Sequence, residues 1–257
     1  MTEAGILERI EVAAAEVRLL GATAPKIALS VTSLDDLGEH FRQKAELQLA
    51  APGASGGFEG AGLRLGTIGG VQVLALVQDQ LRAPSLREAT LPIRLARRLG
   101  AEVLLISGRG WSLNPLWARA RLMLVVDHIN LLGGNPLVGP NPEELGARFP
   151  DMSEVYDSRL LHLAEESALS RGIHFVRGVY IARAAETSKE SEANLLRRLG
   201  GDAVGEGIVP EAIVAVHGGM KVLGMIRLEA SPGDRESSST PTTLGIAEIV
   251  AGVVSRI

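Results

Sequence analysis

The sequence of 257 residues contains no cysteine and few aromatic side chains. Without cysteine the chain can form neither a disulfide framework nor a thiolate metal site. With only four Phe, two Tyr and two Trp, its core has to be built mainly from Ala, Val, Leu and Ile. The histidines lack the spacing of a metal-binding motif, so we expect no metal site; they are His40, His128, His162, His174 and His217.

An excess of positive charge and a long apolar run are also missing. The formal net charge of −4 argues against nucleic-acid binding, which favours a basic surface. No run reaches the roughly 18 apolar residues of a membrane-spanning helix. The N-terminus, MTEAGILERIEV, carries acidic residues where a signal peptide has basic ones. We therefore expect a cytoplasmic protein that binds neither nucleic acid nor a membrane.

Hydrophobic periodicity predicts helices that alternate with short strands, plus one hairpin at Gly69-Gly70. This order predicts an α/β fold, a single-domain three-layer α/β/α arrangement with a mixed central β-sheet. The expected helices cover residues 3–20, 34–49, 87–99, 186–199, 209–216 and 244–254, and one more begins at Ser153. The expected strands cover residues 27–31, 62–68, 71–77, 103–106, 122–126, 174–182, 202–204 and 221–226.

No composition shift or internal repeat divides the chain, so we expect one domain over residues 1–257, with residues 1–24 as an N-terminal helix. The segment SPGDRESSSTPTT (231–243) is polar and of low complexity, which predicts a mobile loop. The strands at 103–106 and 122–126 each lead into polar, glycine-bearing segments, where α/β proteins bind ligands. Residues 107–112 are therefore a candidate site loop.

Seven segments resemble, in order and spacing, the trimeric purine nucleoside phosphorylase family. They are LNP (113–115), DHINL (127–131), NPLVGPN (135–141), RFPDMSEVYD (148–157), GVYIA (178–182), LGGDAVG (199–205) and VPEAIVAVH (209–217). The resemblance runs from about Pro25 onward. It implies a nucleoside phosphorylase-like fold and a homotrimer. It also implies a glycosyltransferase of purine salvage that splits purine nucleosides into free base and ribose 1-phosphate, with phosphate as co-substrate and no cofactor.

The resemblance also places the ligand positions, many of which carry other residues here. The phosphate-binding positions correspond to Thr32, Gln80, Arg82, Arg109 and Gly207, and the nucleoside-binding positions to Phe149, Glu190, Val204, Glu206 and Ala230. Val31-Thr32-Ser33 stands where the family has Gly-Ser-Gly, and Phe58 where it has a histidine. Arg109 and Trp111 stand at positions where the family's Asn-Ala-Ala-Gly-Gly loop has small residues. No catalytic residue is assigned.

Two hypotheses from different classes follow. The first is an active purine nucleoside phosphorylase. The second is a catalytically inactive or repurposed homologue that acts as a ligand-binding or interaction protein. The substituted ligand positions favour it, because losing one hydrogen-bond donor to the transition state typically costs on the order of 3 kcal/mol of transition-state stabilisation. Arg109 and Glu206, if buried together, would pair and fill the old cavity or hold another polar ligand.

Two histidines receive structural interpretations. Asp127 and His128 follow an apolar strand and are expected to form a hydrogen-bonded structural pair. His217 ends a predicted helix, where a cation would suit the helix dipole.

Overall fold

The computed structural model describes residues 3–19, 25–47, 62–77, 85–117, 122–184, 190–229 and 243–257. Phe58, Gln80, Arg82 and Ala230 lie outside these residues, and so does the predicted loop 231–243 except for Thr243, with which the last helix begins. Within these ranges, no helix combines the length and the apolar character that crossing a bilayer requires.

In the described chain, nine strands form one mixed sheet in the order β2-β3-β4-β1-β5-β8-β7-β6-β9. A further parallel pairing between β5 and β9 joins the last strand back to the middle of the sheet. β5, β8, β7, β6 and β9 therefore form a closed ring. The strands are β1 (Ile27–Val31), β2 (Phe41–Leu47), β3 (Gly62–Ile68), β4 (Val71–Val77), β5 (Val103–Ser112), β6 (Leu122–Leu131), β7 (Val176–Arg183), β8 (Ala203–Gly205) and β9 (Lys221–Glu229).

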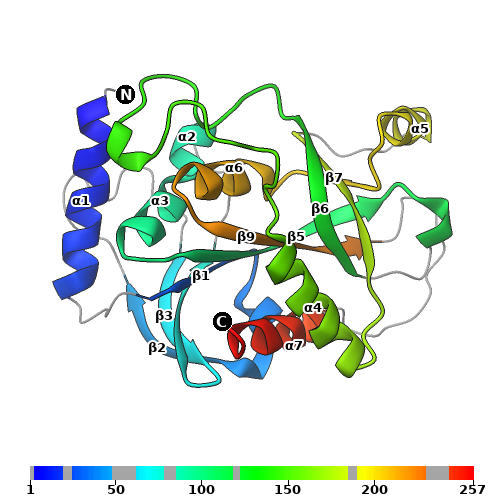
Figure 1. The fold of residues 1–257 in the computed structure, drawn as a ribbon, viewed down its shortest axis with the longest axis horizontal. Coiled ribbons are helices and arrows are strands. Elements are labelled where there is room, and N and C mark those ends of the chain that lie inside the picture. Colours follow the sequence, from blue (N-terminus) through cyan, green and yellow to red (C-terminus); the bar gives the residue numbers. More distant parts are fainter. Residues whose placement is uncertain are drawn as a thin grey trace.

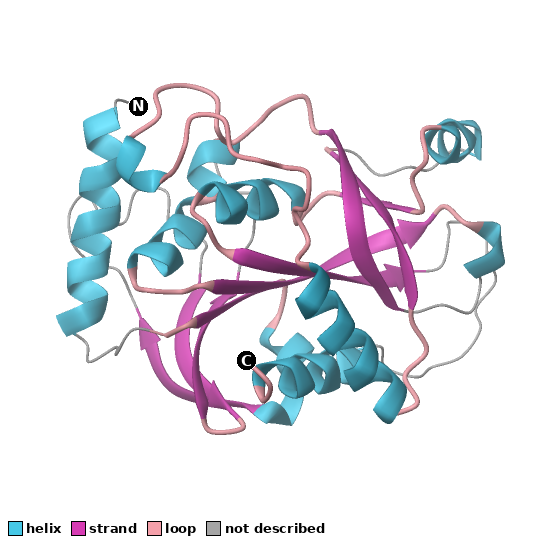
Figure 2. Ribbon diagram, in the orientation of Figure 1, coloured by secondary structure: helices cyan, strands magenta, loops and turns pink. Residues whose placement is uncertain are grey.

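Helices cover both faces of the sheet (Figures 1 and 2). α1, α3 and α6 lie on one side, and α4 and α7 lie together on the other. The predicted α/β fold with a mixed sheet between helices is confirmed. The helices are α1 (Glu3–Leu19), η1 (Leu34–His40), α2 (Leu86–Ala89), α3 (Leu91–Arg98), η3 (Pro115–Trp117), η4 (Glu143–Leu145), α4 (Ser158–Ser170), α5 (Glu190–Arg198), α6 (Val209–His217) and α7 (Thr243–Val254).

The centre of the sheet is buried on both faces, because helices pack on each side of its parallel strands. Every residue of β1 is buried, and so are the first six residues of β5. Both strands begin with a continuous run of apolar residues, the sequence pattern typical of strands buried on both faces. This buried centre fixes the position of the strand ends that carry the polar side chains described below.

The helix predicted at residues 34–49 is wrong. Leu34–His40 forms the short helix η1, and Phe41–Leu47 forms the edge strand β2, which pairs antiparallel with β3. Gly38 interrupts the helical path with a φ of 53°. The apolar spacing of this stretch fits a helix, but hydrogen bonds to β3 override that preference.

Several other predicted boundaries are also wrong. The helix expected from Ser153 begins at Ser158, because Asp157 caps it by accepting the N–H of Leu160 at 2.9 Å. The strands expected to end at residues 106 and 126 continue to Ser112 and Leu131. The segment 107–112 is therefore strand and not loop, since pairing with β9 and β8 satisfies its backbone.

Candidate functional site

The strands β4, β1, β5 and β9 are parallel, so their carboxyl ends lie at the same end of the sheet. Ligand sites of α/β proteins form at the carboxyl ends of such strands. β1 leads directly into Thr32, while Ser107 lies on β5 and Arg227 on β9. The short helix η1 follows β1 and brings Asp36 to the same place. We call these four residues the carboxylate cluster.

The Asp36 carboxylate is the centre of this cluster. Arg227 Nη1 donates to its Oδ1 at 3.1 Å. Two hydroxyls donate to Oδ2, Thr32 Oγ1 at 3.1 Å and Ser107 Oγ at 3.2 Å. Asp36 is only 1% exposed, and a buried carboxylate requires both a counter-charge and hydrogen bonds. The three neighbours supply both.

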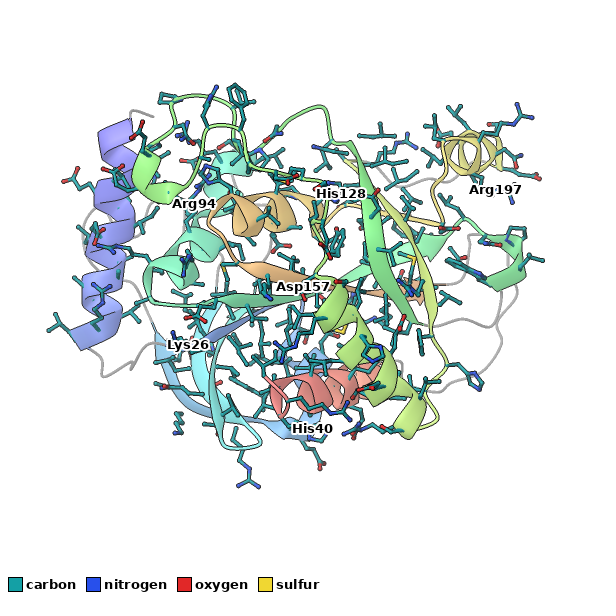
Figure 3. The ribbon with its side chains drawn as sticks, in the orientation of Figure 1. Lys26, His40, Arg94, His128, Asp157 and Arg197 are labelled. Carbon is teal, nitrogen blue, oxygen red and sulfur yellow. The ribbon has the colours of Figure 1, made fainter. Side chains whose placement is uncertain are left out.

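Local sequence explains how Asp36 reaches this position. Ser33 caps η1 by accepting the N–H of Asp35 at 3.2 Å, which starts a turn directly after β1. Leu37 is fully buried next to Asp36. At the end of the turn, His40 contacts Glu248 of α7 at 3.0 Å, and Figure 3 shows His40 close to that helix. η1 is therefore held at both ends.

A second polar contact lies deeper under the same strands. Ser30 of β1 donates to Glu211 of α6 at 2.6 Å, and both side chains are buried. Tyr180 of β7 is fully buried, and its hydroxyl donates to the backbone oxygen of Arg109 at 3.2 Å. Burial raises the pKa of Tyr180, so the phenol stays protonated at neutral pH. These groups fix β1, β5, β7 and α6 relative to one another.

Backbone strain occurs between β8 and α6. Ile208 has a φ of 63°, a conformation that a β-branched residue adopts only when its surroundings impose it. It directly follows Glu206 and Gly207, two positions that the family resemblance assigns to ligand binding. Such strain often occurs at ligand sites.

Near the cluster, the structure brings only some of the predicted site residues together. Thr32 belongs to the cluster, whereas Val204 is buried in a small apolar group. Arg109 is exposed on β5, and Glu206 is half-buried after β8. In the described chain these two form no ion pair with each other; the buried ion pair at this edge joins Asp36 and Arg227 instead.

Two further predicted residues lie on the surface. Phe149 is 87% exposed, with the Arg148 guanidinium 5.8 Å from its ring centroid. It lines a surface cavity of about 470 Å³ together with His128 and Asn130. Glu190 is exposed at the start of α5. No contact recorded among the described residues joins either side chain to the carboxylate cluster.

The structure confirms the hydrogen-bonded pair of Asp127 and His128 but not the cationic role of His217. Asp127 accepts the backbone N–H of His128 at 2.7 Å, while His128 Nδ1 faces the Tyr156 hydroxyl at 3.3 Å (Figure 3 labels His128). Burial lowers the pKa of His128. The prediction of a cationic His217 is wrong, because burial and the nearby Arg94 charge lower its pKa to about 4.

Sequence reasoning missed the centre of the cluster. The sequence predicts Asp36 to lie in a helix over residues 34–49 and Ser107 to begin a loop over residues 107–112. The available signal was SLDDLGEH directly after a buried strand, which places two carboxylates at a strand end. Among the described residues, no group of three or more His, Asp or Glu side chains could hold a metal ion.

Comparisons with known proteins agree on one family. A model described as the phosphorylase superfamily matches residues 27–251. Purine nucleoside phosphorylase 1 of Bacillus subtilis is 38% identical over 227 residues, which cover 85% of this chain and 83% of that protein. Purine nucleoside phosphorylase 1 of Geobacillus stearothermophilus is 44% identical over 142 residues, covering 55% of this chain and 52% of its own.

Solved structures give the same result for the fold. A purine nucleoside phosphorylase of Schistosoma mansoni in complex with adenosine has a TM-score of 0.78 and 27% identity, with 97% of this chain and 93% of that chain covered. A structure of a purine nucleoside phosphorylase from Schistosoma mansoni in complex with acetate has a TM-score of 0.81 at 24% identity, and the match covers 97% of this chain and 96% of that chain.

Proposed function

The chain belongs to the phosphorylase superfamily, and on this basis we propose that it is a purine nucleoside phosphorylase-like protein whose ligand site lies around the carboxylate cluster. The observation that carries the proposal is the 38% identity to purine nucleoside phosphorylase 1 of Bacillus subtilis, sustained over 85% of this chain. The proposed reaction is phosphorolysis. A phosphate oxygen attacks C1′ of the ribose, the bond from C1′ to the purine nitrogen breaks, and its electron pair passes to the base, which takes up a proton.

The donors of the cluster match the demands of such a reaction. Thr32 and Ser107 offer hydroxyls and Arg227 offers a guanidinium, all directed at one point near the ends of parallel strands. Hydroxyl and guanidinium donors are the groups that stabilise a phosphate and the charge that develops during its attack. The resemblance assigns Thr32 to phosphate, and Ser107 and Arg227 are added by their contact with the same carboxylate.

The Asp36 carboxylate favours the second candidate function, a repurposed homologue that binds a ligand without phosphorolysis. It already accepts hydrogen bonds from all three donors. A phosphate placed about 4 Å from it would meet a repulsion of roughly 4 kcal/mol at an effective dielectric constant near 20. That energy corresponds to about a thousandfold loss of affinity. While Asp36 stays in place, it therefore weakens the binding of a second anion to these donors.

A phosphate-dependent assay with inosine, guanosine and adenosine separates the two candidates. The comparison uses the natural chain and Asp36→Ser, which removes the charge and keeps a small polar side chain. Phosphorolysis by the natural chain establishes the enzyme. The repurposed homologue is established by two results together. The natural chain binds a nucleoside without turning it over, and Asp36→Ser gains either turnover or phosphate binding. If neither protein binds a nucleoside in calorimetry, both candidates are wrong.

The proposal includes one nucleoside phosphorylase-like domain that assembles as a homotrimer and works in the cytoplasm in purine salvage. The exposed Phe149 supports an assembly, because a large apolar side chain that is 87% exposed in one chain gains free energy by burial against another. Light scattering tests it. A trimer for the natural chain and a smaller species for Phe149→Ser support the proposal, and a monomeric natural chain contradicts it.

A further inference from the structure

A second charged site lies away from the carboxylate cluster, between α3, α6 and η4. It is a cavity of about 540 Å³, lined by three arginines of α3 (Arg94, Arg97 and Arg98) and by Glu143, Glu144 and His217 among others. Figure 3 labels Arg94, which lies close to α6. We call this cavity the Arg94 cleft. The lining contains three arginines and two glutamates, so its positive groups outnumber its negative ones.

Arg94 is the unusual member of this group. Arg94 is only 7% exposed, and its Nε has no hydrogen-bond partner among the residues that the structure describes. Burial and the charge of Arg87 lower its pKa to about 10, which still leaves it protonated at neutral pH. Among the described residues no carboxylate forms an ion pair with it. A buried, unpaired guanidinium is energetically unfavourable, and such a charge normally has an anionic partner.

The neighbouring hydrogen bonds show that His217 cannot act as that partner. Asn141 Nδ2 donates to the Gly146 oxygen at 2.9 Å, so Asn141 Oδ1 is left to accept from His217 Nε2, also at 2.9 Å. The proton of His217 is therefore on Nε2, and its Nδ1 accepts from Arg94 Nη1 at 3.4 Å. A neutral imidazole takes one hydrogen bond from the guanidinium and leaves its charge unbalanced.

The other two arginines add charge but have partners of their own. Arg97 donates to the backbone oxygens of Gly218 at 2.7 Å and Ala101 at 3.3 Å. Arg98 forms an ion pair with Glu11 at 2.5 Å. Glu143 and Glu144 are exposed on η4 and form no ion pair with a described residue. Arg94 is therefore the group whose hydrogen-bonding capacity remains available.

We propose that the Arg94 cleft binds a small oxyanion, a phosphate or a carboxylate group of a free ligand, with the Arg94 guanidinium as its principal contact. A planar guanidinium can give two parallel hydrogen bonds to such a group. Arg97 and Arg98 raise the local positive potential. The site shares no residue with the carboxylate cluster, and its occupation does not depend on nucleoside chemistry.

The test follows the imidazole of His217, which touches Arg94, by NMR of histidine-labelled protein. His217→Gln assigns its signals. Inorganic phosphate, sulfate and acetate are titrated separately at constant ionic strength set with chloride. Phosphate or sulfate is expected to move the His217 signals with a saturable dissociation constant on the order of millimolar. A response to acetate identifies carboxylates as ligands as well.

Two variants identify the contact. Arg94→Lys keeps the charge but loses the paired donors, so it is expected to weaken binding about tenfold. The matched control, Arg98→Lys on the same helix, is expected to change it less than about twofold, because Arg98 is already paired. The Glu143→Gln/Glu144→Gln double variant avoids any change in the core and is expected to tighten binding about threefold by removing like charge.

Three results would overturn the proposal. The first is the absence of any movement of His217 at ~100 mM phosphate, far above a millimolar constant. The second is a Glu143→Gln/Glu144→Gln protein that loses stability and binds no tighter, because a glutamate would then neutralise Arg94. The third is a His217 shift that follows protein concentration and not anion concentration, since a second copy of the chain would then occupy the cleft.

Discussion

The carboxylate cluster and the Arg94 cleft each bury a charge, and they balance it in opposite ways. In the cluster, Asp36 has the guanidinium of Arg227 and two hydroxyls within 3.2 Å. In the cleft, the described side chain that contacts the Arg94 guanidinium is a neutral imidazole, that of His217 at 3.4 Å. The first charge is balanced by the chain itself. The second is left for a group from outside.

The difference teaches where an added anion can bind. At the cluster, an incoming phosphate has to compete with a carboxylate that is already in contact with the donors, so its binding there is weakened by charge repulsion. At the cleft, an anion removes the cost of an unpaired buried charge and binds without displacing anything. The substitutions below test this contrast, starting with the largest expected effect.

Asp36→Asn should destabilise the chain most. It leaves Arg227 as a half-buried charge without its partner, and breaking a buried pair in this way typically costs about 3–5 kcal/mol. Urea unfolding followed by circular dichroism measures the change. The double variant Asp36→Leu/Arg227→Met should recover most of the loss, because both charges then disappear. If Asp36→Asn alone lowers the free energy of unfolding by less than about 1 kcal/mol, the ion pair of Asp36 and Arg227 is not buried in solution.

Arg94→Met should have a much smaller effect, within about 1 kcal/mol of the natural chain in either direction. It removes one hydrogen bond to His217, worth about 1 kcal/mol, together with an unfavourable unpaired charge. Methionine keeps much of the side-chain length, so little cavity is created. The same urea experiment, in buffer without phosphate, makes the comparison. A loss as large as that of Asp36→Asn would mean that an internal carboxylate balances Arg94.

The stability of the chain should fall as the pH drops from about 6.5 toward 4. The pKa of His217 is lowered to about 4 in the folded protein, by burial first and then by Arg94. The unfolded chain therefore binds more protons between these two values, and stability rises with pH across that window. His128, whose pKa burial also lowers, acts in the same direction. Urea midpoints at pH 7, 5.5 and 4.5 should show a slope that His217→Gln makes shallower, and an unchanged slope would contradict this account.

Glu102→Gln should have the smallest effect. Glu102 pairs with Lys26 at the surface, and the hydrogen bond and charge of Lys26 lower the pKa of its carboxyl. Water already solvates both groups, and exposed ion pairs of this kind contribute little. The urea midpoint should stay within experimental error of the natural chain. A clear loss of stability would indicate that the substitutions at Asp36, Arg94 and His217 measure a general effect of charge and not an effect of burial.

The sequence predicts the fold better than the site. The strands at 27–31, 62–68 and 71–77 are recovered with the predicted bounds, because each is a continuous or alternating apolar run ended by glycine or a polar turn. The stretch 34–49 is misread because its apolar residues fit a helical period, and only its pairing with β3 decides the outcome. The carboxylate cluster depends on contacts between residues far apart in the sequence, so the local pattern SLDDLGEH places Asp36 near a strand end but does not reveal Ser107 and Arg227 as its partners. Conversely, Arg109 and Glu206 stand at ligand positions of the family resemblance but form no ion pair with each other in the described structure.

The closed ring of strands also has a consequence for how the chain folds during synthesis. Val103 of β5 pairs with Lys221 of β9, which lies nearly half the chain away. At about 5–20 residues per second, a ribosome needs on the order of 10 s to make the segment between them. For that time the apolar first half of β5 lacks one of its neighbours, and contacts of such long range also slow folding itself. The nascent chain is therefore expected to need protection from aggregation until β9 has emerged.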